Sequence, residues 1–401
     1  MKNVKKVDVN FFYSKIRIIL FLLITSLASH AQDSLRQSPK NVFHVSGYIK
    51  DLQSATFTDN AKSLITGNYI HNRINFKWDI TEHLHLRLEA RNRLYYGEQV
   101  KNTYQFGKFI DADNGYFDLS YNIINDTSIV LNTALDRALF NWSDKKIDVT
   151  IGRQRINWGI NLVWNPNDIF NTFNYFDFDY EERPGSDAVR IQYNTGIFSS
   201  VQMAYKPAKN SNQQVGAIMY KTNLRKYDLQ NFAGVYQQDV VVGTGWAGNI
   251  KQTGFIGEAS YFHKYKNVAD TNGVLIASFS FDQTFKNDYF VMASYLYNSN
   301  GKDLLYGVSD FNRINLSAKN LMPFSHTFFA HVTKAFNPLV SAGFSTMFSP
   351  MKNTLILFPT VNISVSDDWE LALIGQSFFA DVNKVYRTLG NAVYLRLRWS
   401  Y

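Results

Sequence analysis

The last nine residues of the chain, VYLRLRWSY at positions 393–401, carry the pattern that decides the fold. The apolar and aromatic residues Val393, Leu395, Leu397, Trp399 and Tyr401 alternate with Tyr394, Arg396, Arg398 and Ser400. Since successive side chains of a strand point to opposite faces, the segment predicts a strand with one apolar and one polar face. The alternative is an edge strand of a secreted sandwich. A soluble protein rarely leaves such a flat aromatic edge exposed, so a closed β-barrel in a membrane is favoured.

The same alternation with a period of two residues recurs near the beginning of the chain. Between positions 83 and 94, one face takes Leu84, Leu86, Leu88 and Ala90, and the other takes His83, His85, Glu89 and three arginines. The stretch 70–78 sets Ile70, Ile74, Phe76 and Trp78 against His71, Arg73, Asn75 and Lys77. Beyond Gln32 no window predicts a long amphipathic helix or an apolar membrane helix.

Short turn signals and longer connections separate these runs. The turn signals are Asp79 to Glu82, Ser143 to Lys145, Asn194 to Gly196, Lys286 to Asp288, Asn337-Pro338 and Ser366 to Asp368. Longer connections are expected near 158–185, 206–214, 265–273, 299–325 and 382–389. Short turns at one end and long loops at the other are typical of outer-membrane barrels, in which the short turns face the periplasm.

Counting strands backwards from the end predicts an all-β fold, a transmembrane antiparallel β-barrel of about 18 strands, with 16 as the alternative. Near the beginning, strands are expected at 42–52, 67–79 and 83–96. The stretch 115–142 holds either one strand or two. Because an even total requires one, we place it at 136–142.

The N-terminus has the layout of a secretory signal peptide. Five basic residues and one acid precede an apolar run from Ile18 to Leu27, and Ser29-His30-Ala31 offers a cleavage site before Gln32. The alternative is a retained helix anchor, although the run is about half the length of a spanning helix. The expected organisation is a signal peptide at 1–31, a periplasmic tail at 32–41 and the barrel at 42–401.

Composition narrows the class further. The chain lacks Cys, which excludes disulfide scaffolds and thiolate chemistry, and its aromatic content of 16% suits the aromatic girdles of a barrel. The formal charge is +8, of which the leader contributes +4, and the basic residues are spread along alternating segments. Nucleic-acid binding is therefore not expected.

Enzyme and cofactor motifs are nearly missing from the sequence. Gly243, Gly245 and Gly248 match the dinucleotide pattern G-x-G-x-x-G, but the chain continues as a strand pattern where a helix would be required. These glycines are expected to relieve crowding in a curved barrel wall. We expect no cofactor, no metal and no catalytic residue, and a barrel enzyme with Ser and His on neighbouring strands stays as a further alternative.

The segment IGRQRINWGINLVWNPNDIF, residues 151–170, and the RPGSDAVRIQY that follows at 183–193 carry a resemblance. The motifs that resemble bacterial outer-membrane porin-like barrels are Gly152-Arg153-Gln154-Arg155, Trp158-Gly159, Asn165-Pro166 with Asp168, and Arg183-Pro184-Gly185 with Asp187 and Arg190. The chain is similar in layout to alginate-export and capsule-assembly barrels. The resemblance implies a barrel of about 18 strands in a bacterial outer membrane.

Charged residues of the alternating segments are expected to face the lumen, because a charge facing lipid at mid-membrane costs about 2–4 kcal/mol. The predicted pore-lining residues are Arg87, Arg91, Arg93, Arg153, Arg155 and Arg190. Asp177 and Asp179, in the long connection 161–186, are predicted to fold into the barrel opposite this wall. Alternatively, the arginines brace the wall through pairs with Glu89 or Asp136, or the connection caps the barrel from outside.

The leading hypothesis is a passive channel for small hydrophilic, anionic solutes, because rings of Arg and Lys favour anions. The alternative is a surface barrel that binds or exports acidic polysaccharide. The expected partners are outer-membrane lipid, the barrel-assembly machinery and these solutes. Trp399 and Tyr401 are the expected assembly signal, since amphipathic rings are favoured at the membrane boundary.

Overall fold

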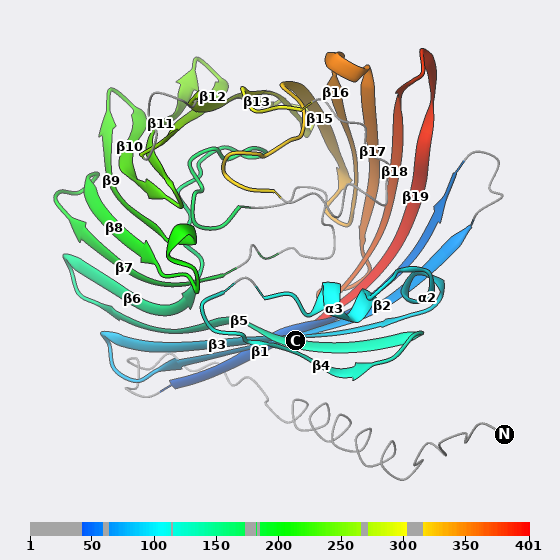
Figure 1. Cartoon of the computed structure of the whole chain (residues 1–401), viewed down its shortest axis with the longest axis horizontal. Coiled ribbons are helices and arrows are strands. Elements are labelled where there is room, and N and C mark those ends of the chain that lie inside the picture. Colours follow the sequence, from blue (N-terminus) through cyan, green and yellow to red (C-terminus); the bar gives the residue numbers. More distant parts are fainter. Residues whose placement is uncertain are drawn as a thin grey trace, which may run out of the picture. The chain divides into compact units, whose positions relative to one another are not determined.

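The computed structural model describes residues 42–58, 64–113, 115–172, 182, 185–265, 272–302 and 316–401. In this part of the chain one antiparallel sheet closes on itself, because the last strand pairs with the first (Figure 1). No helix of these ranges is long and apolar enough to cross a membrane. The expected signal peptide and periplasmic tail lie outside the described residues.

The strands are β1 (Val42–Phe57), β2 (Ile65–Asp79), β3 (Leu84–Tyr96), β4 (Ser120–Asn125), β5 (Ile129–Ser143), β6 (Ile147–Gln154), β7 (Ser186–Asn194), β8 (Ser200–Lys206), β9 (Val215–Leu224), β10 (Tyr227–Tyr236), β11 (Asp239–Ile250), β12 (Thr253–Lys264), β13 (Val274–Thr284), β14 (Tyr289–Asn298), β15 (His326–Asn337), β16 (Val340–Ser349), β17 (Thr354–Ser364), β18 (Trp369–Val382) and β19 (Val385–Ser400). Two short helices, α2 (Glu98–Asn102) and α3 (Phe106–Ile110), precede β4. Single 3-10 turns occur at Ser211–Gln213 and Pro350–Lys352.

Eighteen of these nineteen strands form the ring, because β4 does not occupy a place of its own. On one side β5 pairs with β3, and on the other side it pairs with β4 over Val130–Ala134 and with β6 over Ala138–Ser143. The predicted barrel of 18 strands is confirmed. The prediction of one strand at 136–142 is wrong, since the stretch 115–142 holds all of β4 and most of β5.

A β-bulge in β5 explains why the sequence pattern was ambiguous there. The pairing with β3 steps from Glu89 opposite Arg137 to Ala90 opposite Leu135, which leaves Asp136 as the extra residue. Both Asp136 and Arg137 are buried, whereas Phe140 on the outer face is exposed. A bulge re-aims side chains, so the inward positions change from even to odd numbers at this point.

The two ends of the barrel differ in the length of their connections. All six predicted short turns join consecutive strands at the end that also holds Val42 and Tyr401. The opposite end holds the long connections after β3, β6, β12 and β14. The expected long connection at 382–389 is wrong. Asn383 and Lys384, with φ of 53° and 64°, form a two-residue hairpin turn that matches the twist of its strands.

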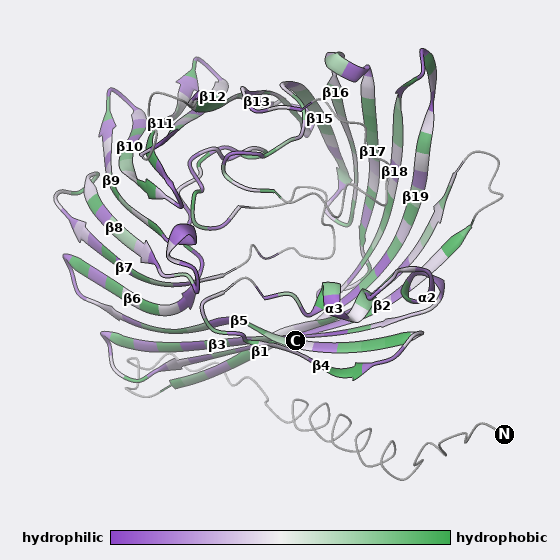
Figure 2. Ribbon diagram, viewed as in Figure 1, coloured by the Kyte–Doolittle hydropathy of each residue, from purple (hydrophilic) through white to green (hydrophobic). Residues whose placement is uncertain are grey.

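The outer face of the barrel is apolar between two aromatic levels. Large side chains such as Ile151, Val189, Leu373 and Leu395 are exposed there, although each lies mid-strand. Hydrophobic residues recur along the strands of the barrel in Figure 2. Exposed rings near the short-turn end are Phe43, Trp142, Tyr193, Tyr289, Phe336 and Trp369, and those near the other end are Tyr96, Tyr205, Tyr261, Phe328 and Phe348. Such girdles are typical of transmembrane barrels, in which rings lie at both membrane boundaries.

Tyr401 connects the first and last strands at the place where the barrel closes. Its backbone exchanges two hydrogen bonds with Gly47 of β1, at 2.9 and 3.0 Å. Its hydroxyl donates to the carbonyl of Arg73 on β2 at 3.1 Å, and therefore reaches across β1. A Cβ at Gly47 would lie 2.9 Å from Tyr401 Cζ, so only glycine leaves room for the ring. The terminal residue thus ties together three neighbouring strands.

We expect Tyr401→Asp to lower the amount of folded barrel, because a carboxylate cannot fill the space over Gly47 and is disfavoured at the membrane boundary. Tyr401→Phe keeps the ring and is the matched control, which should fold nearly as well as the parent chain. The fraction that migrates as a heat-modifiable band on a gel measures this. Equal folded fractions for Tyr401→Asp and the parent would contradict a role in closure.

Candidate functional site

The segment that follows β6 folds into the barrel. Ile156, Trp158, Val163, Trp164 and Phe170 are all buried, although none belongs to a strand. The ring of Trp158 packs edge-on against Phe170 at 5.0 Å and against Phe232, an inward-facing residue of β10, at 5.5 Å. Figure 1 shows this teal-green segment within the ring of strands. For its described part, 161–172, the predicted inward fold is confirmed.

Glu258 of β12 is the main polar anchor of this segment. Its Oε1 accepts hydrogen bonds from the backbone N–H groups of Ile160 and Asn161 at 2.5 and 2.6 Å, and its Oε2 accepts one from Asn167 at 2.9 Å. The side chain is fully buried. A loop that leaves bulk water needs partners for its backbone donors, and a carboxylate that accepts three of them is itself stabilised.

Further contacts fix the segment to β10, β11 and β13. Gln230 Nε2 donates to the carbonyl of Trp158 at 2.5 Å, and Ser278 Oγ donates to the carbonyl of Trp164 at 3.0 Å. Asn167 Nδ2 donates to the carbonyl of Thr244 at 2.9 Å. Gly245, one of the three glycines of the rejected motif, lies beside this contact, and a Cβ there would come within 2.9 Å of Asn167 Nδ2. The glycine therefore makes room for the segment, inside a strand that continues into β12.

A second inward segment connects β14 to β15. Ala318, Met322 and Phe324 are buried, and Asn298 at the end of β14 donates to the carbonyl of Met322 at 2.8 Å. Lys319 forms an ion pair of 2.6 Å with Asp239 of β11. The sequence predicted only a long connection here, although the run Leu321-Met322-Pro323-Phe324 is a signal of burial in an otherwise polar stretch.

The return of the first segment reaches a different part of the wall. Glu182 accepts a hydrogen bond from the Tyr48 hydroxyl of β1 at 3.1 Å and lies 3.4 Å from Arg73 of β2. The connection between β6 and β7 therefore touches β10 to β13 with one part and β1 and β2 with another. Asp177 and Asp179, which were predicted to face the arginine wall, lie outside the described residues, as do Arg183 and Pro184.

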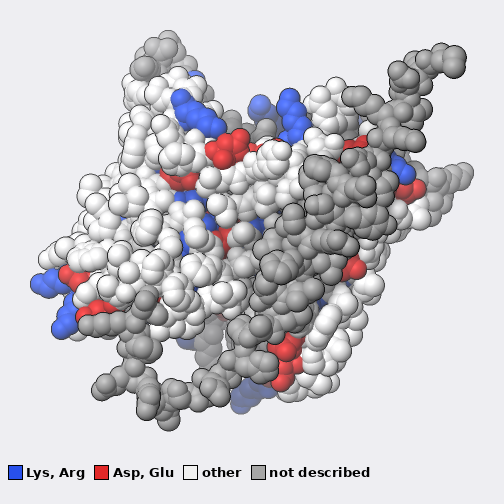
Figure 3. Space-filling view, turned by 90° about the horizontal axis from the view of Figure 1, so that it is seen from below, with Lys and Arg blue, Asp and Glu red and all other residues white. Residues whose placement is uncertain are grey.

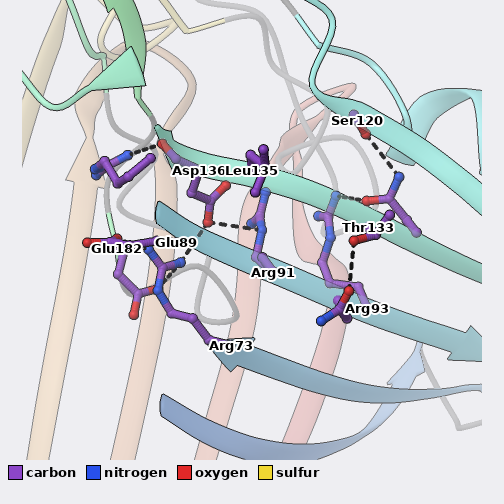
Figure 4. Close-up of polar contacts among 12 residues, drawn as sticks. Arg73, Glu89, Arg91, Arg93, Ser120, Thr133, Leu135, Asp136 and Glu182 are labelled. Atoms are coloured by element: carbon purple, nitrogen blue, oxygen red, sulfur yellow. Dashed lines mark hydrogen bonds and ion pairs between the residues drawn. The ribbon is translucent and has the colours of Figure 1, made fainter. Parts of the chain in front are cut away.

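Arg73 is the centre of a buried ionic cluster on the inner wall (Figure 4). It is 1% exposed and forms ion pairs with Asp136 at 2.6 Å and with Glu89 at 2.5 Å. Arg91 adds a contact of 3.3 Å to the same Asp136 carboxylate. Breaking one such buried pair costs about 3–5 kcal/mol, so these arginines hold β2, β3 and β5 together. The contacts of Arg91 agree better with the alternative, in which the arginines brace the barrel wall, than with a role in lining the pore.

Arg153 lies elsewhere than predicted. Its guanidinium donates twice to Asp187, at 2.8 and 2.9 Å, and once to Asp113 at 2.7 Å. The carbonyls of Leu135 and Phe117 take the remaining two donors. All five N–H donors are used, and the residue is 7% exposed. The expectation that it shares a lumen face with Arg155 is wrong, because β6 ends at Gln154 between them and only Arg155 enters the inward segment.

The remaining predicted arginines are less buried. Arg93 donates to Asn132 Oδ1 at 2.9 Å and to the carbonyl of Ile110 at 3.2 Å, which fixes α3 to the wall. Arg190 pairs with Asp148 at 2.5 Å. Arg87 and Arg155 are both exposed, and they face one cavity together with Arg190.

This cavity of about 380 Å³ is the candidate solute site. Its lining residues are Lys77, His85, Arg87, Glu89, Arg137, Leu139, Asn141, Asp148, Thr150, Gln154, Arg155 and Arg190. Five cationic side chains therefore face two carboxylates. Three of the predicted pore-lining residues, Arg87, Arg155 and Arg190, line this cavity, and their role in a solute path stays a prediction. The sequence did not single out Arg137, which the bulge turns inward, or Lys77, which follows the alternation of 70–78.

Comparison with known proteins supports the fold. No family model matches the sequence, and no curated protein matches it. Three solved structures are similar in fold. OccAB1 of Acinetobacter baumannii has a TM-score of 0.56 and 10% identity, and covers 90% of this chain and 96% of its own. OccK11 (OpdR) of Pseudomonas aeruginosa has a TM-score of 0.56 and 8% identity, with coverage of 90% and 96%.

The third structure is the outer membrane protein opdK of Pseudomonas aeruginosa, with a TM-score of 0.53, 6% identity and coverage of 89% and 99%. The fold of this chain is thus that of the closed, porin-like β-barrels of outer membranes. The resemblance to porin-like barrels is confirmed at the level of fold. The likeness to alginate-export and capsule-assembly barrels stays a prediction.

Glu258→Ala is expected to loosen the inward segment, because three backbone donors lose their acceptor, at about 1–3 kcal/mol each. Single-channel recordings in a planar bilayer should then show a noisier and larger conductance. Asp282→Ala removes a carboxylate of the neighbouring strand β13 that makes no hydrogen bond or ion pair with the described residues of the segment, and it serves as the control. If the two variants show the same current noise, the segment is not held by Glu258.

Proposed function

We propose that this chain is a passive channel of a bacterial outer membrane that lets small hydrophilic, anionic solutes cross. The observation that carries the proposal is the cavity whose lining includes five cationic side chains, Lys77, Arg87, Arg137, Arg155 and Arg190, and two carboxylates, Glu89 and Asp148. An excess of cations in a wet, narrow space attracts anions and repels cations. The N-terminal segment 1–31 is proposed to be the signal peptide that exports the chain, with cleavage between Ala31 and Gln32.

The described structure supports two different roles for the arginines that were predicted to line the pore and for Arg73. Arg73, Arg91 and Arg153 are balanced by carboxylates at contact distance and stabilise the wall. The guanidinium groups of Arg87 and Arg155 face the cavity instead. An anion that passes this cavity exchanges part of its hydration for charge-assisted contacts without meeting a closed site, which suits passage rather than retention.

The inward segments narrow the path that such a solute would take. Residues 160–167 of the connection between β6 and β7 are held by Glu258 of β12, and Glu182 of the same connection reaches β1 and β2. A constriction made in this way sets a size limit while the cavity sets the preferred charge. Asp177 and Asp179 are proposed to lie at this constriction, opposite the cationic wall.

The alternative, binding or export of acidic polysaccharide, relies on loop aromatics that offer their faces to sugars. Trp158, Trp164 and Phe170 are buried among inward-facing residues of the wall. These three rings therefore pack against the barrel wall, whereas the other aromatic residues of the connection, at 173–180, lie outside the described residues. A barrel enzyme, the third alternative, has no described feature in its favour.

The double variant Arg87→Gln with Arg155→Gln should shift ion selectivity toward cations. At about 6 Å in a wet lumen each lost charge weakens the attraction of an anion by about 0.7 kcal/mol, or roughly threefold in local concentration. The reversal potential in a salt gradient measures the shift. Lys334→Gln removes a cation that packs on Tyr289 at the outer face, and it should leave the reversal potential unchanged. Unchanged selectivity in the double variant would exclude this cavity from the solute path.

Asp177→Asn with Asp179→Asn should shift selectivity in the opposite direction, toward anions, because two negative charges would leave the constriction. Ser211→Ala, in the connection after β8, is a control for loop substitutions that leave the charge unaltered. A double variant whose reversal potential equals that of the parent would place these carboxylates outside the pore.

A further inference from the structure

A row of hydrogen-bonded polar side chains crosses the outer face of four neighbouring strands. Thr133 of β5 donates to Asn92 of β3 at 2.7 Å, and Asn92 donates to Asn72 of β2 at 3.0 Å. Asn72 donates in turn to the Tyr401 hydroxyl at 3.2 Å. The register places these residues on the outer face of the barrel. Asn72 lies two positions from Ile70, which faces outward, and it pairs with Ile49 and with Asn92, which itself lies two positions from outward Leu94.

Asp51 and Gln53 of β1 extend the row upward. Asp51 pairs with Ile70 and with Leu397, which are both exposed on the outer face. Gln53 Nε2 donates to Asp51 Oδ1 at 2.6 Å. Among the described strands, Asp51 is the only carboxylate on the outer face that lies away from the strand ends. We call the set Asp51, Gln53, Asn72, Asn92 and Thr133 the outer polar row.

The outer polar row lies within the membrane band. Asn72 is six residues above Trp78, whose ring stacks on Phe43 at 5.1 Å in the lower aromatic level. At about 3.3 Å per residue and a tilt near 40°, it stands about 15 Å above that level, in the middle of a band of about 25 Å. Lipid chains offer no hydrogen-bond partner there.

Strand β17, which is three places from β1 in the ring, shows what a surface in contact with lipid looks like in this chain. The outward positions of β17 are Leu355, Leu357, Pro359, Val361 and Ile363, without a single polar side chain. Figure 3 views the molecule from the side that lies lowest in Figure 1, where β1, β3 and β4 are. Most of the described surface in that view is uncharged, with acidic and basic side chains both in its middle and at its margins.

We propose that the outer polar row is the contact surface between two copies of this chain in the membrane. The proposal is independent of what passes through the lumen. Two copies related by a twofold axis along the membrane normal would place row against row. Lipid would then be excluded from every polar group in it.

Self-complementarity of the row is the reason for choosing a second copy. Asparagine and glutamine side chains both donate and accept, so a row of amides can pair with its own image. Asp51 already accepts from Gln53 within its own chain, and amides of the other copy can supply the remaining donors. A different protein would be expected to place a cation beside the Asp51 carboxylate. In this chain the carboxylate already accepts a hydrogen bond from the amide of Gln53, which favours a partner that also offers amides.

Disulfide crosslinking tests the proposal directly, because the chain has no Cys. Gln53→Cys, Asn92→Cys and Thr133→Cys are introduced singly, and intact outer membranes are treated with a mild oxidant. The expected result is a species of twice the chain mass from these variants. Leu357→Cys on β17 and Ala330→Cys on β15 place the thiol on the outer face of strands that do not belong to the row, and these variants should stay monomeric.

A second pair of changes tests the contribution of the row without altering the contacts of Tyr401 with Gly47 and Arg73. Asp51→Leu with Gln53→Leu should abolish the dimer on a native gel while the heat-modifiable band persists. The proposal is overturned if the three row variants stay monomeric although folded, if the β15 and β17 controls crosslink equally well, or if the row variants crosslink to a different protein.

Discussion

The need to pair every backbone N–H and C=O group inside an apolar membrane is the constraint on which the rest of this structure depends. A sheet satisfies it only when its first and last strands meet, because an open edge would leave a row of unpaired groups in lipid. The pairing of β1 with β19 closes the ring, and Tyr401 extends it across Gly47 to the carbonyl of Arg73. The final residue is therefore part of the architecture and not a tail.

The same requirement governs what lies inside the barrel. A segment that leaves the wall at Gln154 carries its backbone groups away from both the sheet and bulk water, so the wall must supply partners. Glu258, Gln230 and Ser278 do so from three strands. Apolar packing of Trp158 against Phe232 then replaces the water that would otherwise fill this side of the lumen. This packing lies against β10, whereas the cationic cavity is lined by residues of β2, β3, β5, β6 and β7.

Local patterns in the sequence were enough to predict the strands but not the contacts between distant segments. The alternation at 83–94 and 393–401 appears unchanged as β3 and β19, since period two is a property of each strand alone. The bulge at Asp136 breaks that period, so β4 and β5 were not separated. Arg153 meets Asp187 and Asp113, which lie 34 and 40 residues away along the chain. No spacing rule predicts such a meeting, because it depends on where two loops fold.

The arginines of the lumen show why a count of charges does not measure selectivity. The guanidinium of Arg73 has a carboxylate at 2.6 Å. From a few ångströms away such a pair is close to neutral, so it exerts little electrostatic force on a passing ion. The same side chain contributes to stability, because removing it would leave Asp136 and Glu89 buried without their partner. Selectivity therefore depends on the imbalance that remains after such pairing. Five cations and two carboxylates line the cavity of Arg87 and Arg155. Of these, Arg190 pairs with Asp148, Lys77 pairs with Asp79 outside the lining, and Glu89 pairs with Arg73 of the neighbouring cluster.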